Sequence, residues 1–341
     1  MKNPFSISLT LVLAVAAGPG KSLAASAPAS PAQAMYARPL AELKAKAAGG
    51  NPSAQVALGH HFFSGDGVEQ SYAAAAAWYR KAAWKGDPDG EFNLGLSYDT
   101  GRGVHQDHAE AVRWYYMAAR LGFPDAEYNL GFSYDEGLGV QQDPAEALKW
   151  WQRAADQGFA PAQFMLGLCY AGGQYVPQDA VEAVRWYQLA AKQGFADAQF
   201  NLGCSYQDGL GVPQDPAESV RWMRRAAASG QTQAIYTLAF YYHNGHQGIP
   251  KDDVEAVKWY RQAALQGHHT AQFCLGLSYS LGQGVPQDDA EAYVWLSISA
   301  TNGDSWAPTY RDGSAGKLSL PVLEQAQTRA RQIFAQIQAK Q

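Results

Sequence analysis

The chain has 341 residues, of which 47% are hydrophobic and 17% are charged. This composition is too apolar for a disordered protein, so the chain is expected to fold around a sizeable core. The formal net charge is −5, from 26 basic and 31 acidic residues, and the basic residues form no run. Nucleic acid and other polyanions are therefore not indicated as partners.

The first 24 residues have the pattern of a secretory signal peptide. An apolar run over 7–17 follows Lys2, and the small residues Ser22 and Ala24 mark a cleavage site. The run is too short to span a bilayer stably, and no cysteine stands beside the cleavage site to carry a lipid. We predict a soluble protein, periplasmic or secreted, that is not inserted in the membrane after cleavage. Residues 25–35 are rich in Ala, Ser and Pro, which predicts a flexible leader.

Seven of the ten tryptophans recur in register along the chain. The successive spacings are 36, 36, 36, 36, 37 and 36 residues, between Trp78, Trp114, Trp150, Trp186, Trp222, Trp259 and Trp295. A fixed period of this length is the signature of a solenoid, in which each repeat buries its apolar side against its neighbours. We therefore predict a linear stack of seven repeats.

Each period contains a first segment with the pattern of one helix face. In the third period Ala126, Leu130 and Tyr134 stand at i, i+4 and i+8, and Gly131 stands beside them. A glycine inside a helix costs about 1 kcal/mol relative to alanine, so its recurrence in register predicts a close contact with another helix. The alanine pair of the second segment, at 154–155 in this period, is the expected partner of that glycine.

The boundaries of the second segment carry helix signals. An Asp-x-x-Glu pattern predicts a capping box, in which Asp accepts a backbone amide hydrogen and Glu reaches back to the Asp amide. The six pairs are Asp107/Glu110, Asp143/Glu146, Asp179/Glu182, Asp215/Glu218, Asp252/Glu255 and Asp288/Glu291. A glycine suited to a left-handed C-terminal cap follows each segment, as at Gly122 and Gly158. A Gly-x-Gly-Val turn, as at 137–140, connects the two segments.

Together these residues resemble the Sel1-like repeat, a relative of the tetratricopeptide repeat. The clearest match is Ala-Glu-Tyr-Asn-Leu-Gly-Phe-Ser-Tyr-Asp-Glu-Gly-Leu-Gly-Val at 126–140, followed by Asp143, Ala147, Trp150 and Gly158. The resemblance covers 51–306 as seven repeats. It implies an all-α fold, a right-handed superhelical α/α solenoid of helix hairpins. It also implies a monomeric adaptor or scaffold that binds a protein or peptide, with no enzymatic activity and no cofactor.

The segments that flank the repeats are expected to cap the solenoid. Residues 36–50 predict an N-terminal capping helix, and 307–341 predict a C-terminal capping helix with an apolar stripe between Leu320 and Phe334. Two repeats depart from the pattern. Repeat four has Tyr175 after Gly173-Gln174 and loses the second turn glycine, and repeat six has an extra residue in its turn at 245–249. A local bend or a specialised loop is expected at both.

One face of the first helices is a candidate binding surface. It lies opposite the apolar stripe, and the corresponding face lines the concave groove in the tetratricopeptide relatives. The candidate residues are Asp89, Phe92, Asn93, Asp99, Asp125, Tyr128, Asn129, Phe132, Asp135, Glu136, Asp197, Phe200, Asn201 and Asp208. One hypothesis is a peptide groove in which the asparagines bond a ligand's main chain and the aspartates attract a basic segment. The alternative is that the aromatic rings pack on the next repeat and the asparagines only belong to the repeat pattern.

A second function class rests on one short motif near the C-terminus. Ser314 and Lys317 match the Ser-x-x-Lys motif, and some cysteine-rich Sel1-like proteins are described as binding penicillin-type substrates. A penicillin-interacting envelope hydrolase, resembling a β-lactamase, is therefore the alternative function, and a purely structural role in an assembly is a third. No Ser-Asp-Asn or Lys-Thr-Gly motif follows, and the segment reads as a glycine-rich loop.

The histidines and cysteines give no strong signal of a metal or redox site. His243 and His246 are the best-placed histidines, but no cysteine or carboxylate set of a recognised metal site flanks them. Cys169, Cys204 and Cys274 lack the spacing of a zinc site, and we expect them to be buried free thiols.

Overall fold

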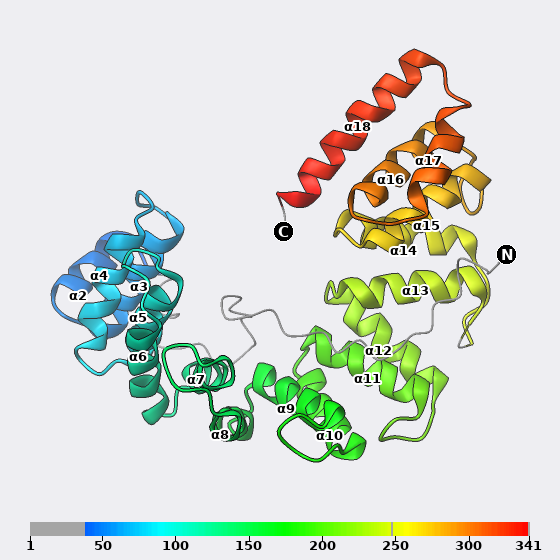
Figure 1. The fold of residues 1–341 in the computed structure, drawn as a ribbon. Helices are drawn as coiled ribbons and strands as arrows, with labels where there is room; N and C mark the ends of the chain where they lie inside the picture. The colour runs from blue at the N-terminus through cyan, green and yellow to red at the C-terminus, as the bar shows by residue number, and fades with distance from the viewer. Residues whose placement is uncertain (1–37, 247, 340–341) are drawn as a thin grey trace. The chain divides into compact units, whose positions relative to one another are not determined.

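The computed structural model of the chain describes residues 38–246 and 248–339. The regular structure of these residues is helical throughout, and successive helices form pairs joined by short turns (Figure 1). Contacts divide the chain into two units, Met1–Phe195 and Ala196–Gln341. The predicted signal peptide and leader, 1–24 and 25–35, lie outside the described residues. Within the described ranges, no helix is long and apolar enough to cross a membrane.

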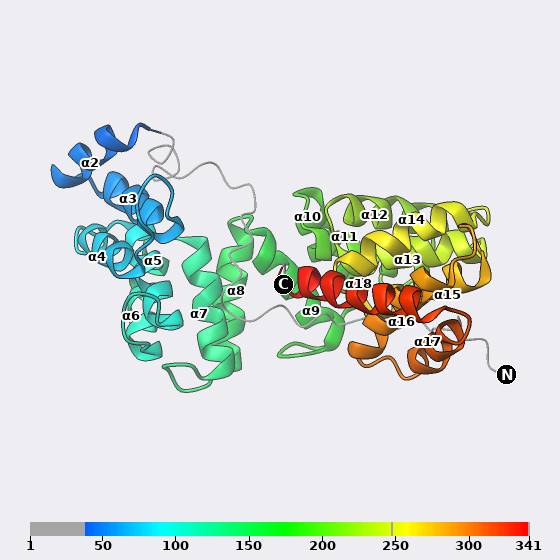
Figure 2. The same cartoon turned by 90° about the horizontal axis from the view of Figure 1, so that it is seen from above.

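Over 38–195 the first unit is a stack of four helix pairs preceded by a single helix. Helix α2 packs on α3, and each later pair packs on the pair before it (Figure 2). The helices are α2 (Leu40–Ala48), α3 (Pro52–Ser64), α4 (Tyr72–Ala83), α5 (Pro88–Thr100), α6 (His108–Arg120), α7 (Pro124–Glu136), α8 (Pro144–Asp156), α9 (Ala160–Gly172) and α10 (Ala180–Lys192). Contacts between sequence neighbours are those of a linear repeat array.

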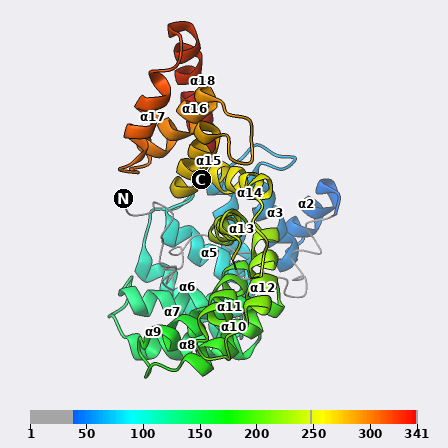
Figure 3. The ribbon, with the colours of Figure 1, turned by 90° about the vertical axis from the view of Figure 1, so that its right-hand side faces the viewer.

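The described residues of the second unit form three further pairs and two terminal helices. They are α11 (Ala196–Asp208), α12 (Pro216–Ala228), α13 (Thr232–Asn244), α14 (Asp253–Leu265), α15 (His269–Leu281), α16 (Asp289–Thr301), α17 (Ala307–Ala315) and α18 (Leu320–Gln338). Helices α17 and α18 both pack on α16, so two helices cover the last repeat (Figure 3). The stretch around Ser314, expected to be a loop, belongs to α17. Pro308 stands in the first turn of that helix, where no amide hydrogen is needed.

The predicted aspartate caps are present, but only half of each capping box forms. The Asp143 side chain accepts the backbone N–H groups of Ala145 and Glu146, both at 3.1 Å. The Asp143 amide donates to the carbonyl of Tyr134 in the first helix at 2.8 Å, so it does not bind Glu146. Glu146 pairs with Lys149 at 2.8 Å instead. The same arrangement recurs at Asp107, Asp179, Asp215 and Asp252.

The glycine inside a first helix makes room for a large side chain of the second helix. A Cβ added at Gly131 would lie 2.3 Å from Nε1 of Trp151, which directly follows the recurring tryptophan. The predicted partner of this glycine, the alanine pair, is therefore wrong. The alanines approach the next repeat, because a Cβ added at Gly90 in α5 would lie 2.7 Å from the Cβ of Ala82 in α4.

The recurring tryptophan packs against the repeat before its own. Trp150 of α8 is buried in a cluster with Phe92 and Tyr115 of the preceding pair. Trp114 packs in the same way on the cluster of the first pair, and Trp78 packs on the cluster that includes α2. Each of these three tryptophans thus covers apolar residues of the helices before its own repeat, as expected for a side chain that recurs at a constant spacing.

In three repeats a buried glutamine near the start of the first helix links it to the preceding helix. Nε2 of Gln55, Gln163 and Gln272 donates to an alanine carbonyl there, at 3.1, 3.2 and 3.0 Å. Glu91 and Glu127 stand at the same position of their repeats. A carboxylate cannot donate this bond, so each glutamate needs another way to be stabilised.

Glu91 is the less well stabilised of the two glutamates. It is 1% exposed, and its Oε2 has no hydrogen-bond partner among the described residues. Burial, together with the nearby carboxyl of Asp87, raises the pKa of Glu91 to about 7. Ionised Glu91 therefore destabilises the contact between the first two repeats.

Replacing Glu91 with Gln is expected to stabilise the first unit at alkaline pH. The folded chain holds the Glu91 proton more tightly than the unfolded chain, so the free energy of unfolding falls as the pH rises from about 4.5 to about 7. Glu91→Gln removes this loss, with a gain of about 2 kcal/mol at pH ~8 and little at pH ~4. Urea unfolding followed by circular dichroism measures both values.

Glu127→Gln is the matched control, because it removes the ion pair between Glu127 and Arg153. Burial also raises the pKa of Glu127, but Arg153 and Gln157 oppose the rise, so Glu127→Gln should bring a smaller gain at pH ~8 than Glu91→Gln. Equal stabilisation by the two substitutions would contradict the account of Glu91.

Candidate functional site

The predicted binding residues lie on three first helices. Asp89, Phe92, Asn93 and Asp99 are in α5; Asp125, Tyr128, Asn129, Phe132, Asp135 and Glu136 are in α7; Asp197, Phe200, Asn201 and Asp208 are in α11. The first ten belong to the first unit and the last four to the second. Their burial separates side chains that pack between helices from those that reach the surface.

The three phenylalanines are packing residues, and the partly exposed Tyr128 packs against Phe132. Phe92, Phe132 and Phe200 are 9%, 9% and 3% exposed. The ring centroid of Phe92 lies 5.3 Å from that of Phe123, and Phe132 lies 5.3 Å from Trp151. These rings pack between helices and expose little area to a ligand.

The three asparagines occupy different environments. Nδ2 of Asn93 donates to the Asp89 carbonyl of its own helix at 2.7 Å, and the Asn129 side chain bonds the Tyr115 hydroxyl. Both asparagines are partly exposed, whereas Asn201 is 2% exposed. Surface recognition by asparagine is therefore possible at Asn93 and Asn129 without rearrangement, and not at Asn201.

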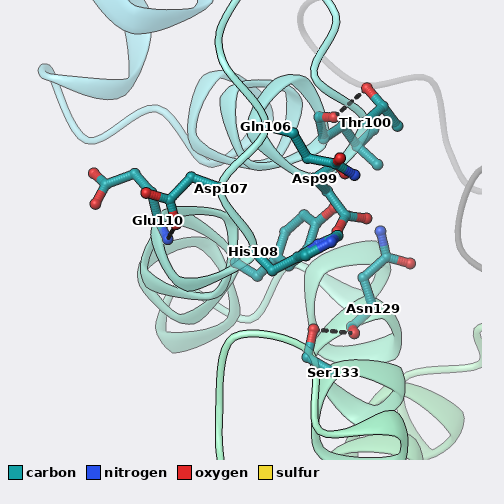
Figure 4. Close-up of polar contacts among 10 residues, drawn as sticks. Asp99, Thr100, Gln106, Asp107, His108, Glu110, Asn129 and Ser133 are labelled. Atoms are coloured by element: carbon teal, nitrogen blue, oxygen red, sulfur yellow. Dashed lines mark hydrogen bonds and ion pairs between the residues drawn. The ribbon is translucent and has the colours of Figure 1, made fainter.

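A polar cluster brings two predicted residues, Asp99 and Asn129, together with two that the sequence analysis did not select. Nδ1 of His108 lies 2.8 Å from Oδ1 of Asp99, and the Tyr115 hydroxyl donates to Oδ2 at 3.4 Å. Figure 4 shows Asp99 and His108 facing each other, with Asn129 on the adjoining helix. The Asp99 cluster (Asp99, His108, Tyr115 and Asn129) thus joins α5, α6 and α7. Burial, and then Asp99, raises the pKa of Tyr115 well above its usual value, so its hydroxyl stays protonated.

In repeat four, Tyr175 occupies the position of the second turn glycine. Its φ is +66°, the left-handed conformation that Gly103 and Gly139 adopt at the same place in their repeats. A Cβ at Gly139 would lie 2.3 Å from the backbone of the preceding second helix, so the turn with Tyr175 cannot approach α8 as closely. The Tyr175 hydroxyl donates to the carboxylate of Asp135, and its ring lies 6.3 Å from that of Trp151. These contacts offset the strain of the left-handed backbone.

The carboxylates of this face do not all ionise in the same pH range. Burial raises the pKa of Asp125 to about 6, and it also raises the pKa of Asp197. Glu136, at the end of α7, is exposed. The negative charge that α7 presents is therefore fully developed only above about pH 6.

The comparisons with known proteins identify the repeat. Seven successive segments match the Sel1 repeat: 52–87, 88–123, 124–159, 160–195, 196–231, 232–268 and 269–304. The chain belongs to the Sel1 repeat family.

Two solved structures illustrate the similarity. A Sel1 repeat protein from Oxalobacter formigenes is 32% identical, with a TM-score of 0.67, over 83% of this chain and 86% of that chain. A protective antigen of uropathogenic Escherichia coli that displays an SLR fold is 29% identical, with a TM-score of 0.49, over 90% of this chain and 72% of that chain. The comparison with curated proteins gives no match.

The Ser-x-x-Lys motif does not form an accessible catalytic pair in this Sel1 repeat protein. Ser314 is 1% exposed, and its Oγ is enclosed without a hydrogen-bond partner among the described residues. Nζ of Lys317 is held by Asp289 at 2.9 Å. A nucleophilic serine needs both access to substrate and a free base, and this arrangement provides neither.

The remaining chemical candidates are structural. In the part of the chain that the structure describes, no three His, Cys, Asp or Glu side chains are placed to hold a metal ion. His243 pairs with Asp253 at 2.9 Å. All three cysteines are buried, and burial raises the pKa of each thiol to about 12, which makes them poor nucleophiles.

Removing the carboxylate of Asp99 should weaken the packing of α5, α6 and α7. Asp99→Ala leaves His108 and the buried Tyr115 hydroxyl without this acceptor, at an expected cost of about 2 kcal/mol. Urea unfolding of the purified chain measures the loss. Glu136→Ala, at an exposed position of α7, should change stability by less than about 0.5 kcal/mol. Equal effects of the two substitutions would show that the Asp99 cluster has no structural role.

Proposed function

We propose that this Sel1 repeat protein is an exported, monomeric adaptor that binds a segment of a partner protein along its first helices. Repeat solenoids present long surfaces built from successive units, and such folds typically mediate protein–protein interaction. The predicted concave face corresponds to the surface that carries Asn93, Asp125, Asn129, Asp135 and Glu136. No enzymatic step is part of the proposal.

The observation that carries the proposal is the polar face of α5 and α7. Asn93 and Asn129 are partly exposed amides one repeat apart, on helices of identical length. An extended segment lying across the two helices has main-chain groups that these amides can bond. Buried aromatic rings beneath them hold the helices at a constant separation, so the amides are presented in register.

The charge of the face favours a basic segment. Asp125, Asp135 and Glu136 supply carboxylates, and α7 has no basic residue in its last turn. Asp125 ionises near pH 6, so affinity for lysine and arginine should rise as the pH increases through that value.

A phage-displayed library of random peptides tests the proposed function with the purified full chain. The enriched peptides should be basic, and the double variant Asn93→Ala/Asn129→Ala should bind them about tenfold more weakly. Asn201→Ala is the matched control, because this asparagine is buried, and it should leave binding unchanged. Peptides that bind the double variant as well as the wild type would overturn the proposed surface. Thermal unfolding by circular dichroism establishes that each variant is folded.

Export is tested by the mass of the mature protein. The protein recovered outside the cytoplasm should begin at Ala25, because cleavage is expected after Ala24. Recovery of a chain that still begins at Met1 would remove export from the proposal.

A further inference from the structure

Two glutamates at the same position of successive repeats have different surroundings. Oε1 of Glu127 lies 3.1 Å from the Arg153 guanidinium, and its Oε2 accepts a hydrogen bond from Gln157 at 2.6 Å. Arg153 is in α8, the second helix of the same repeat, and Gln157 directly follows that helix. Glu127 is therefore buried with a cation and an amide, which is how a buried carboxylate is normally stabilised.

Glu91 has neither of these partners. The residues that correspond to Arg153 and Gln157, thirty-six positions earlier, are Met117 in α6 and Leu121 directly after α6. In the described part of the chain, no lysine, arginine or histidine forms an ion pair with Glu91. The carboxyl of Asp87, which has the same sign, lies close enough to raise the pKa of Glu91 further.

The side chains that replace the missing donors are apolar and exposed. Met117 is 47% exposed and Leu121 is 58% exposed. Trp84, at the end of α4, is 75% exposed, although Arg120, Asp156 and Lys192 stand at its position in the next three repeats. Leu121 stands where the other repeats have polar residues, whereas the positions of Met117 and Trp84 also hold leucine elsewhere, at Leu189 and Leu265. A group of exposed apolar side chains is the kind of surface that a partner covers.

The repeat register relates these three positions: Met117 and Leu121 stand where Arg153 and Gln157 contact Glu127, and Leu121 also corresponds to a residue that contacts the preceding turn. The residue at the Leu121 position reaches back to the turn of the preceding repeat, as the bond from Gln193 to the Gly158 carbonyl at 2.8 Å shows. For Leu121 that turn is the one at Gly86, two residues after Trp84. Lys85, between them, is turned away, because its ammonium group bonds the Gly50 carbonyl.

We propose that Trp84, Met117 and Leu121 form a docking surface for a partner segment that inserts an arginine beside Glu91, with apolar neighbours of that arginine covering the three exposed side chains. The inserted arginine takes the place that Arg153 holds at Glu127, and Asp87 adds to the negative charge that attracts it. The surface lies on the second helices α4 and α6, so it is separate from the first-helix face. Apolar cover also excludes water from the new ion pair and strengthens it.

The probes are three short peptides, acetylated and amidated at their ends. The sequences are Ser-Leu-Arg-Leu-Ser, the same peptide with Gln in place of Arg, and Ser-Ser-Arg-Ser-Ser. Binding to the full chain is followed by the ¹H–¹⁵N signal of the Trp84 indole, which Trp84→Phe assigns. The first peptide should bind at least about tenfold more tightly than either of the others. Equal binding of all three, or no movement of the Trp84 signal at millimolar peptide, would overturn the proposal.

Three variants test whether Glu91 causes the preference for the arginine peptide. Glu91→Gln should abolish the difference between the Arg and Gln peptides, and it should remain folded because Gln stands at this position in other repeats. The double variant Met117→Arg/Leu121→Gln gives Glu91 the two partners that Glu127 has. It should weaken binding of the Arg peptide about tenfold, because the introduced arginine then occupies the place of the peptide's arginine. Glu127→Gln should leave binding unchanged. An arginine preference that survives in Glu91→Gln, or is lost in Glu127→Gln, would contradict the assignment.

Discussion

The first unit depends on the contacts that Trp78, Trp114 and Trp150 make with the helices before their own repeats. A single helix pair of this size cannot bury its own apolar side, so its stability comes from its neighbours. Trp150 closes the cluster formed by Phe92 and Tyr115, and the preceding tryptophans do the same one and two repeats earlier. The glycine inside the first helix adds the close approach in every pair except that of α13 and α14, where Ala239 takes its place. The rest of the architecture follows from repeating these two contacts.

Much of this architecture could be predicted from the sequence, because the signals are local or periodic. The tryptophan spacing predicts the stack, and the aspartate and glycine signals predict where the second helices begin and end. The partner of the helix glycine could not be predicted, because alanine and aromatic residues both recur at the right spacing. The second half of the capping box failed for a similar reason: the amide of Asp143 finds a carbonyl in another helix, which the local pattern does not contain.

The surface residues were harder to predict than the fold. The Asp99 cluster needs His108 and Tyr115, which lie nine and sixteen residues away from Asp99. The contrast between Glu91 and Glu127 becomes visible only when the structure shows that Arg153 and Gln157 face Glu127. Once that register is known, the sequence itself shows that Met117 and Leu121 replace them. Repeats whose first helices have the same length therefore present different surfaces through a few side chains at fixed positions.

The most direct measurement is hydrogen exchange by mass spectrometry, resolved by repeat, on the wild type and on Gly131→Ala. The added methyl group collides with Trp151 and should destabilise the third repeat by about 1–3 kcal/mol. If stability comes from neighbouring contacts, exchange should accelerate most in α7 and α8, less in the adjacent pairs, and little in α15 and α16. Equal acceleration in all helices would show a single cooperative unit and contradict the account.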